Sequence, residues 1–99
     1  MNGMRAIHPG EILKEELGEL NLSSNALAKA LDVPTKRITA ILNEQRGITS
    51  DTALRLAKFF GTAPKFLMSL QSSYDVKKAR EAVGQEIGRN VKPRALLAA

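Results

Sequence analysis

Residues Thr35 to Asn43 combine apolar side chains on one helical face with polar ones on the rest of the surface. If the apolar residues face a core, the outward side chains are Thr35, Lys36, Arg37, Thr39, Ala40 and Asn43. Lysine and arginine can pair with guanine, asparagine with adenine, and the methyl group of threonine or alanine can contact that of thymine. Each side chain could be an ordinary solvated one, but together they predict a helix that reads base edges, with Arg37 suited to a base or a phosphate.

Two polar segments beside this stretch are suited to hold the DNA backbone. Each lies at the start of a predicted helix or in the loop before it, where free amide groups and the helix dipole favour an anion. The candidate phosphate contacts are Ser24, Asn25, Arg46, Thr49 and Ser50. Arg46 is the strongest of them because its loop follows the predicted base-reading helix, and the adjacent Gly47 is free to take a positive φ.

No pattern in the sequence predicts catalysis, a metal site or a cofactor. The chain has no cysteine and one histidine, His8, and it lacks a glycine-rich phosphate loop and a paired-histidine metal motif. His8 stands before Pro9, which suits the first position of a helix, so we interpret it as a structural residue at a helix entrance. We therefore expect a protein that is not an enzyme and that binds no metal or cofactor.

Two short helical patterns and a tight corner must position the predicted base readers. The first pattern carries Leu27, Ala28 and Leu31 on one face. Residues 32–34, Asp-Val-Pro, are too few for anything but a turn; aspartate tolerates a left-handed backbone, and proline suits the start of the next helix. A plain helical hairpin would explain any one of these features. Their combination favours a helix-turn-helix, whose second helix enters the major groove of DNA.

The remaining patterns predict an all-α domain of five helices, in which the second and third form the helix-turn-helix. We expect helices over about residues 9–20, 24–31, 35–43, 50–60 and from 64 onward, with Ser23 or Ser24 and Thr49 or Ser50 as N-caps. The last helix could end near Ser72 or continue to about Val83. Residues 1–83 are predicted to form one compact domain, and residues 84–99 a basic, poorly ordered tail.

Composition places the excess positive charge outside the predicted reading unit. The chain of 99 residues is 43% hydrophobic, enough for one modest core, and carries a net charge of +5. Residues 77–99 hold six of the fifteen Lys and Arg residues but two of the ten Asp and Glu residues, so net charge alone is weak support for DNA binding. Without cysteine, a signal peptide or a membrane span, the chain is expected to be soluble and cytoplasmic, with no membrane contact.

The motifs together resemble the HigA-type antitoxins, also labelled virulence-associated protein I, of the XRE or lambda-repressor-like superfamily. The resemblance covers about residues 7–76. It is carried by His8–Leu13, Leu27–Asn43, Arg46–Thr49, Asp51–Ala53, Arg55–Ala57, Phe60–Gly61, Leu70–Gln71 and Tyr74–Asp75. Asp32 stands where the superfamily often has glycine, and Phe66-Leu67 where HigA-like chains usually carry a tryptophan, so packing of the fifth helix is expected to differ in detail.

The resemblance implies a homodimer that binds a palindromic operator in its own promoter. It also implies a complex with a RelE-like HigB toxin, a ribosome-dependent mRNA endonuclease that the antitoxin inhibits. Dimers of such families often use the segment around the fifth helix, which points to Phe66, Leu67, Leu70 and Tyr74. Each of these side chains could instead belong to the core, and the core is the preferred assignment for Phe66 and Leu70.

The first helix is a candidate toxin-docking surface, because ribosome-directed nucleases tend to be basic and this helix is acidic. Glu15 and Glu19 represent this surface, and the preferred alternative is that they belong to an ordinary solvated face. Two other functions remain open: a stand-alone transcriptional regulator without a toxin, and a helical protein-interaction module with a degenerate DNA surface.

Overall fold

The computed structural model describes residues 5–97, with side chains described to residue 95. This part of the chain contains helices and no strand, which confirms the predicted all-α class. The helices are α1 (Pro9–Leu20), α2 (Ser24–Leu31), α3 (Thr35–Leu42), α4 (Ser50–Phe60), α5 (Pro64–Asn90) and the single turn α6 (Arg94–Leu97). None of these described helices is long and apolar enough to cross a bilayer.

Local capping chemistry explains where the first helices begin. His8 is the N-cap of α1: its Nδ1 accepts from the Gly10 amide at 2.8 Å, and the Glu11 carboxylate accepts from the His8 amide at 3.4 Å. Ser23 caps α2 and Thr49 caps α4, which decides between the predicted alternatives. The interpretation of His8 as a structural residue at a helix entrance is confirmed.

The corner between α2 and α3 depends on one left-handed residue. Asp32, the C-cap of α2, has φ 58° and ψ 50°, as its tolerance of that region predicts. The amide of Val33 then donates to the Ala28 carbonyl at 3.0 Å, which satisfies one of the carbonyls left free at the end of α2. The corner therefore forms without the glycine that is common in such turns.

The core lies where α1, α2, α3 and α4 meet. Leu27, Ile38 and Ile41 are fully buried, and Ala28 is 1% exposed, so the predicted inward faces of α2 and α3 are confirmed. Gly10 also belongs to this contact, because a Cβ at that position would overlap the Ile41 carbonyl oxygen. The N-terminal end of α1 is thus packed directly against the backbone of α3.

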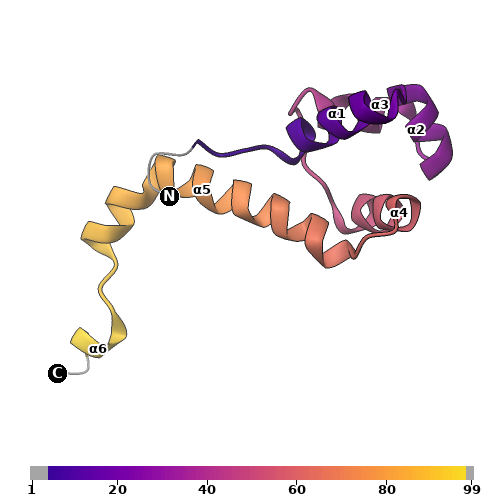
Figure 1. Ribbon diagram of the computed structural model, residues 1–99. Coiled ribbons are helices and arrows are strands. Elements are labelled where there is room, and N and C mark those ends of the chain that lie inside the picture. The colour runs from indigo at the N-terminus through magenta and orange to yellow at the C-terminus, as the bar shows by residue number, and fades with distance from the viewer. Residues whose placement is uncertain (1–4, 98–99) are drawn as a thin grey trace.

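The first turns of α5 pack on this core, and the rest of α5 leaves it. Tyr74 stacks edge-on against His8 with ring centroids 4.8 Å apart. Beyond Asp75, α5 projects away from α1–α4 (Figure 1), which lengthens the molecule to 58 Å along one axis against 24 and 22 Å along the others. We call the projecting segment Val76–Asn90 the arm. The compact part of the fold ends before the arm.

The predicted poorly ordered tail differs from the structure, because α5 continues without a break through residues 84–90. The predicted boundary between Val83 and Gly84 therefore lies inside a helix. Each glycine costs a helix about 1 kcal/mol relative to alanine, but Gly84 and Gly88 stand among good helix formers, and Lys78 pairs with Glu81 at 3.5 Å. The helix ends three residues before Pro93, where proline commonly stops one.

Candidate nucleic-acid interface

Burial of one face of α3 determines which of its side chains face outward. Because Ile38 and Ile41 are fully buried, the opposite face of α3 is available to a ligand. Lys36 and Asn43 are exposed, while Thr35, Thr39 and Ala40 are partly exposed. The structure therefore brings five of the six predicted base readers to one accessible surface.

The hydrogen bonds of two threonines determine which groups of this surface remain available to a ligand. The Thr35 hydroxyl donates to the Asn25 side-chain oxygen at 2.7 Å, which joins a predicted base reader to a predicted phosphate contact and leaves the Asn25 amide hydrogens free to donate. The Thr39 hydroxyl donates back to the Lys36 and Thr35 carbonyls, at 3.2 and 3.3 Å. Thr39 therefore has its methyl group left for a ligand, as suits contact with a thymine methyl.

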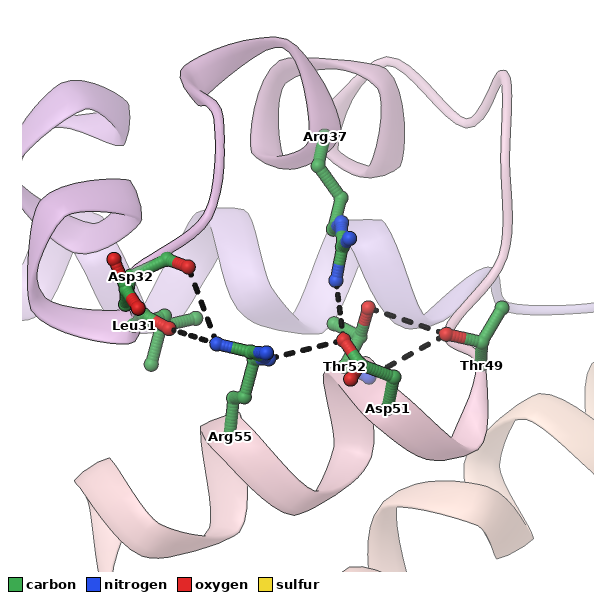
Figure 2. Close-up of polar contacts among 7 residues, drawn as sticks. All are labelled: Leu31, Asp32, Arg37, Thr49, Asp51, Thr52 and Arg55. Atoms are coloured by element: carbon green, nitrogen blue, oxygen red, sulfur yellow. Dashed lines mark hydrogen bonds and ion pairs between the residues drawn. The ribbon is translucent and has the colours of Figure 1, made fainter.

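Arg37 is the exception among the predicted base readers. Its guanidinium turns toward α4 and forms an ion pair with Asp51 (Figure 2). The Arg37 side chain is 26% exposed, so it lies against the protein rather than in solvent. We correct the prediction: Arg37 fixes α3 on α4, because its position on the helix faces an acidic side chain that sequence periodicity could not place.

Arg55 completes this contact, and its role in positioning the helices was not predicted from the sequence. From α4 its Nε donates to Asp51 at 3.0 Å, and its Nη1 donates to the carbonyls of Leu31 and Asp32 at 2.9 and 3.1 Å (Figure 2). These carbonyls are free because α2 ends there. We call Arg37, Asp51 and Arg55 the Asp51 clamp; it ties the end of α2, the corner and α3 to α4.

One contact of the Asp51 clamp could be predicted from the sequence, and the other contacts could not. Asp51 and Arg55 stand four residues apart on one helix, a spacing at which opposite charges attract. The partners of Arg37 and of the Arg55 guanidinium are 14 to 24 residues away. Hydrogen bonds from Arg37 first, and then from Arg55, lower the pKa of the Asp51 carboxyl, so the clamp stays charged at neutral pH.

The predicted phosphate contacts occupy two helix starts and one loop. Ser24 and Ser50 are the first residues of α2 and α4, directly after the N-caps. Thr49 uses its hydroxyl within the cap, accepting from the Thr52 amide at 3.4 Å. Arg46 is exposed in the loop between α3 and α4. Together with Asn25, these residues flank α3 at both ends of the helix-turn-helix.

The loop that carries Arg46 is shaped differently from the expectation. The positive φ belongs to Glu44, at 60°, and not to Gly47. Gly47 is needed for space, because a Cβ there would come within 2.6 Å of the Gln71 side chain. Gln71 in turn accepts from the Ile48 amide at 2.7 Å. The loop is therefore fastened to α5, which holds Arg46 near the end of α3.

The residues predicted for protein contacts lie away from α3, on α1 and α5. Phe66 is 56% exposed, so its alternative role in the core is wrong. Leu67 packs against the core, while Leu70 and Tyr74 are partly buried. These four residues line one side of the first turns of α5.

The acidic surface of α1 is smaller than its composition indicates. Arg5 binds both carboxylate oxygens of Glu11, at 2.7 and 2.8 Å, and this hydrogen bonding lowers the pKa of the Glu11 carboxyl. Glu15, Glu16 and Glu19 are exposed and carry the acidic character that remains. No group of metal-binding side chains occurs within the described residues.

Known proteins share this arrangement over nearly the whole chain. The family model described as helix-turn-helix matches residues 13–67. Virulence-associated protein I of Dichelobacter nodosus is 54% identical over 81 residues, which span 81% of this chain and 75% of that protein. The solved structure of an addiction module antidote protein of the HigA family from Coxiella burnetii has 60% identity and a TM-score of 0.90, and covers 91% of this chain and 99% of that one. The Pseudomonas aeruginosa antitoxin HigA, solved with the higBA promoter, has 46% identity and a TM-score of 0.88, and covers 90% and 98%.

Proposed function

Because the chain belongs to the XRE-type helix-turn-helix family and to its HigA-type antitoxins, we propose that it binds an operator in its own promoter and represses its operon. The observation that carries this proposal is the accessible face of α3, held by the Asp51 clamp on a buried core. The P. aeruginosa relative was solved with promoter DNA, which supports operator binding by this chain. Its place of action is then the cytoplasm, where the DNA is.

The proposed base readers are those that the structure leaves on the outer face of α3. Lys36 and Asn43 are exposed and can hydrogen-bond to guanine and adenine, while Thr39 and Ala40 offer methyl groups to thymine. Thr35 acts with Asn25, to which it is hydrogen-bonded. Phosphates are held by Arg46 and by the helix starts at Ser24, Thr49 and Ser50, where free amides and the helix dipole favour an anion.

Replacement of single side chains tests this assignment by fluorescence anisotropy on a duplex from the upstream region and on a scrambled duplex. Lys36→Ala and Thr39→Ala should weaken specific binding more than non-specific binding, since a good base contact contributes about 1–3 kcal/mol of discrimination. Arg46→Ala should weaken both alike and reduce the salt dependence by about one phosphate contact. Lys65→Ala, an exposed lysine on α5, is the control. Equal losses on both duplexes for Lys36→Ala would show that the base readers are wrongly assigned.

The proposed repressor is a homodimer. Two-fold symmetry would set two α3 helices in successive major grooves, about 34 Å apart on a palindromic operator. Phe66, with more than half of its surface exposed, supports an interface at the first turns of α5, together with Leu67, Leu70 and Tyr74. A sedimentation experiment that found only monomers on and off DNA would contradict this part of the proposal.

The second proposed partner is a RelE-like toxin of the HigB type. The exposed carboxylates of Glu15 and Glu19 offer a docking surface for a basic protein. Reversal of both to lysine should weaken toxin binding in a calorimetric titration, whereas Glu81→Lys on the arm should not. Unchanged toxin affinity after the double reversal would move the docking surface elsewhere.

Two alternatives have distinct outcomes. A stand-alone regulator would have no neighbouring gene for a RelE-like protein. A helical protein-interaction module would give no salt-sensitive, sequence-specific shift with the upstream region.

A further inference from the structure

One side chain of α5 reaches into the loop that carries Arg46. The side-chain oxygen of Gln71 accepts from the amide of Ile48 at 2.7 Å, directly before Thr49, the N-cap of α4. The carboxamide of Gln71 also lies over Gly47, because a Cβ at that glycine would come within 2.6–2.7 Å of its oxygen, carbon and nitrogen. Gln71 therefore contacts both residues that follow Arg46 in the loop.

Asp75 decides which end of the Gln71 amide faces the loop. The Gln71 nitrogen donates to a carboxylate oxygen of Asp75, about one turn further along α5, at 2.9 Å. A carboxylate can only accept and a backbone N–H can only donate, so the nitrogen must face Asp75 and the oxygen must face Ile48. The flipped amide would place two donors against each other at Ile48. Asp75 thus holds the Gln71 amide in the one orientation that binds the loop.

The hydrogen bond from Ile48 lies between two other anchors of the loop. On one side, the amide of Gln45 donates to a carbonyl of α3 at 2.8 Å. On the other side, Thr49 begins α4 as its N-cap. Arg46 stands between these two anchors, and its side chain is exposed. Gln71 therefore adds a third anchor, close to Arg46 and from a different helix.

We propose that Gln71 and Asp75 are positioning residues for operator binding: Asp75 orients the Gln71 amide, and Gln71 holds the loop so that Arg46 meets a phosphate. The inference rests on the phosphate contact of Arg46 in the proposed function and adds two residues that act through the loop. A loop and an arginine lose conformational freedom when the arginine binds a phosphate. A loop that is already fixed in the free protein lowers this entropic cost.

A double-mutant cycle between positions 71 and 46 tests the proposal, with operator affinity of the full chain measured by fluorescence anisotropy. Gln71→Ala should raise the Kd for the upstream duplex about fivefold, since the loss can reach the net contribution of one hydrogen bond. It should also lower the salt dependence of binding, in the same direction as Arg46→Ala. In the Arg46→Ala background, Gln71→Ala should change the Kd less than about twofold, because the group that it positions is absent.

The cycle separates positioning from a general effect on the fold or on self-association, because neither general effect requires Arg46. An equal loss of affinity from Gln71→Ala in both backgrounds would refute the proposal, and so would a Gln71→Ala variant that binds like the wild type. Ser72→Ala, at the exposed next position on α5, is the matched control and should leave the Kd unchanged.

Exchange of donor and acceptor between positions 71 and 75 tests the orientation of the amide. Gln71→Glu keeps an acceptor for the Ile48 amide but sets two carboxylates one helical turn apart, which repel each other, so operator binding should weaken. Adding Asp75→Asn supplies a donor to the new carboxylate and should restore the Kd to within about twofold of the wild type. Adding Glu86→Gln on the arm gives the same net charge and should restore nothing. Equal recovery in both double variants, or none in either, would refute orientation by Asp75.

Failure of this inference is distinct from failure of the proposed function. A wild type without specific binding, or an Arg46→Ala variant with unchanged affinity, overturns the proposed phosphate contact and the positioning role together. If Arg46→Ala weakens binding but the effects of Gln71→Ala and Arg46→Ala simply add, the phosphate contact stands and the positioning role of Gln71 is overturned.

Discussion

Loss of the Arg55 guanidinium should destabilise the whole helix-turn-helix, because this one group joins α4 to the end of α2 and to Asp51. Arg55→Met keeps most of the aliphatic stem and removes the hydrogen bonds. Asp32 is exposed, so water can replace the bond to its carbonyl, and the exposed ion pair with Asp51 adds little. The bond to the carbonyl of buried Leu31, at 2.9 Å, counts most.

A hydrogen bond to a charged group contributes about 1.5–3 kcal/mol, and we expect the free energy of unfolding to fall by that amount. For a domain of this size the melting temperature should fall by roughly 6–24 °C. Urea unfolding followed by circular dichroism measures the change, with an unaltered m-value showing that the unfolded state is unaffected.

Lys58→Met is the control, since it removes an exposed cation from the same helix and should change stability by less than about 0.5 kcal/mol. The loss of stability in Arg55→Lys should lie between those of Arg55→Met and Lys58→Met, because an ammonium cannot bind Asp51 and a carbonyl with the fork geometry of a guanidinium. Arg55→Met as stable as Lys58→Met would refute the view that the Asp51 clamp holds the reading unit in place.

Two further predictions concern the Asp51 carboxyl and two glycines that stand at close contacts. The folded-state pKa of Asp51 is lowered by Arg37 and Arg55, so its stabilising effect is present above the unfolded pKa, about 3.9, and is lost as pH falls through the folded value. The difference in melting temperature between wild type and Asp51→Asn should therefore be constant near neutral pH and shrink in acid; a difference that stays constant down to pH 2 would contradict the assignment. Gly10→Ala should cost about 3 kcal/mol, at the upper end for overpacking, because its Cβ meets backbone at Ile41. Gly47→Ala should lower the free energy of unfolding by only about 1 kcal/mol, because displacing Gln71 loses one hydrogen bond. Denaturant titration measures both losses, and a larger loss for Gly47→Ala than for Gly10→Ala would contradict this reasoning.

Features that depend on neighbours in the sequence were predictable. The buried faces of α2 and α3 follow from helical spacing, and the caps at Ser23 and Thr49 from residues that satisfy free amides. Asp32 was expected at the left-handed corner, and the structure places it there. These features require no knowledge of the tertiary fold, because each depends on atoms within about four residues along the chain.

One poorly predicted feature depends on how helices meet, and the other on local signals that nearly cancel. Phe66 was assigned more readily to the core and is exposed, because the orientation of α5 turns Leu67 inward instead. The tail beyond Gly84 was expected to be poorly ordered, since two glycines and a proline are local breakers, yet α5 carries helical structure through to Asn90. The glycines and the good helix formers around them are nearly balanced local signals, so the sequence alone does not decide between helix and coil there.

The sequence by itself determined the first four helices, the corner and five of the six outward residues on α3, because helical periodicity and capping act locally. Only the tertiary structure decided that Arg37 belongs to the Asp51 clamp and not to the reading surface, and that Arg55 holds the end of α2. Those contacts join residues 14 to 24 positions apart, and a charged side chain looks the same in a sequence whether it meets a phosphate or a carboxylate. Its role is settled by which groups the fold brings within hydrogen-bonding distance.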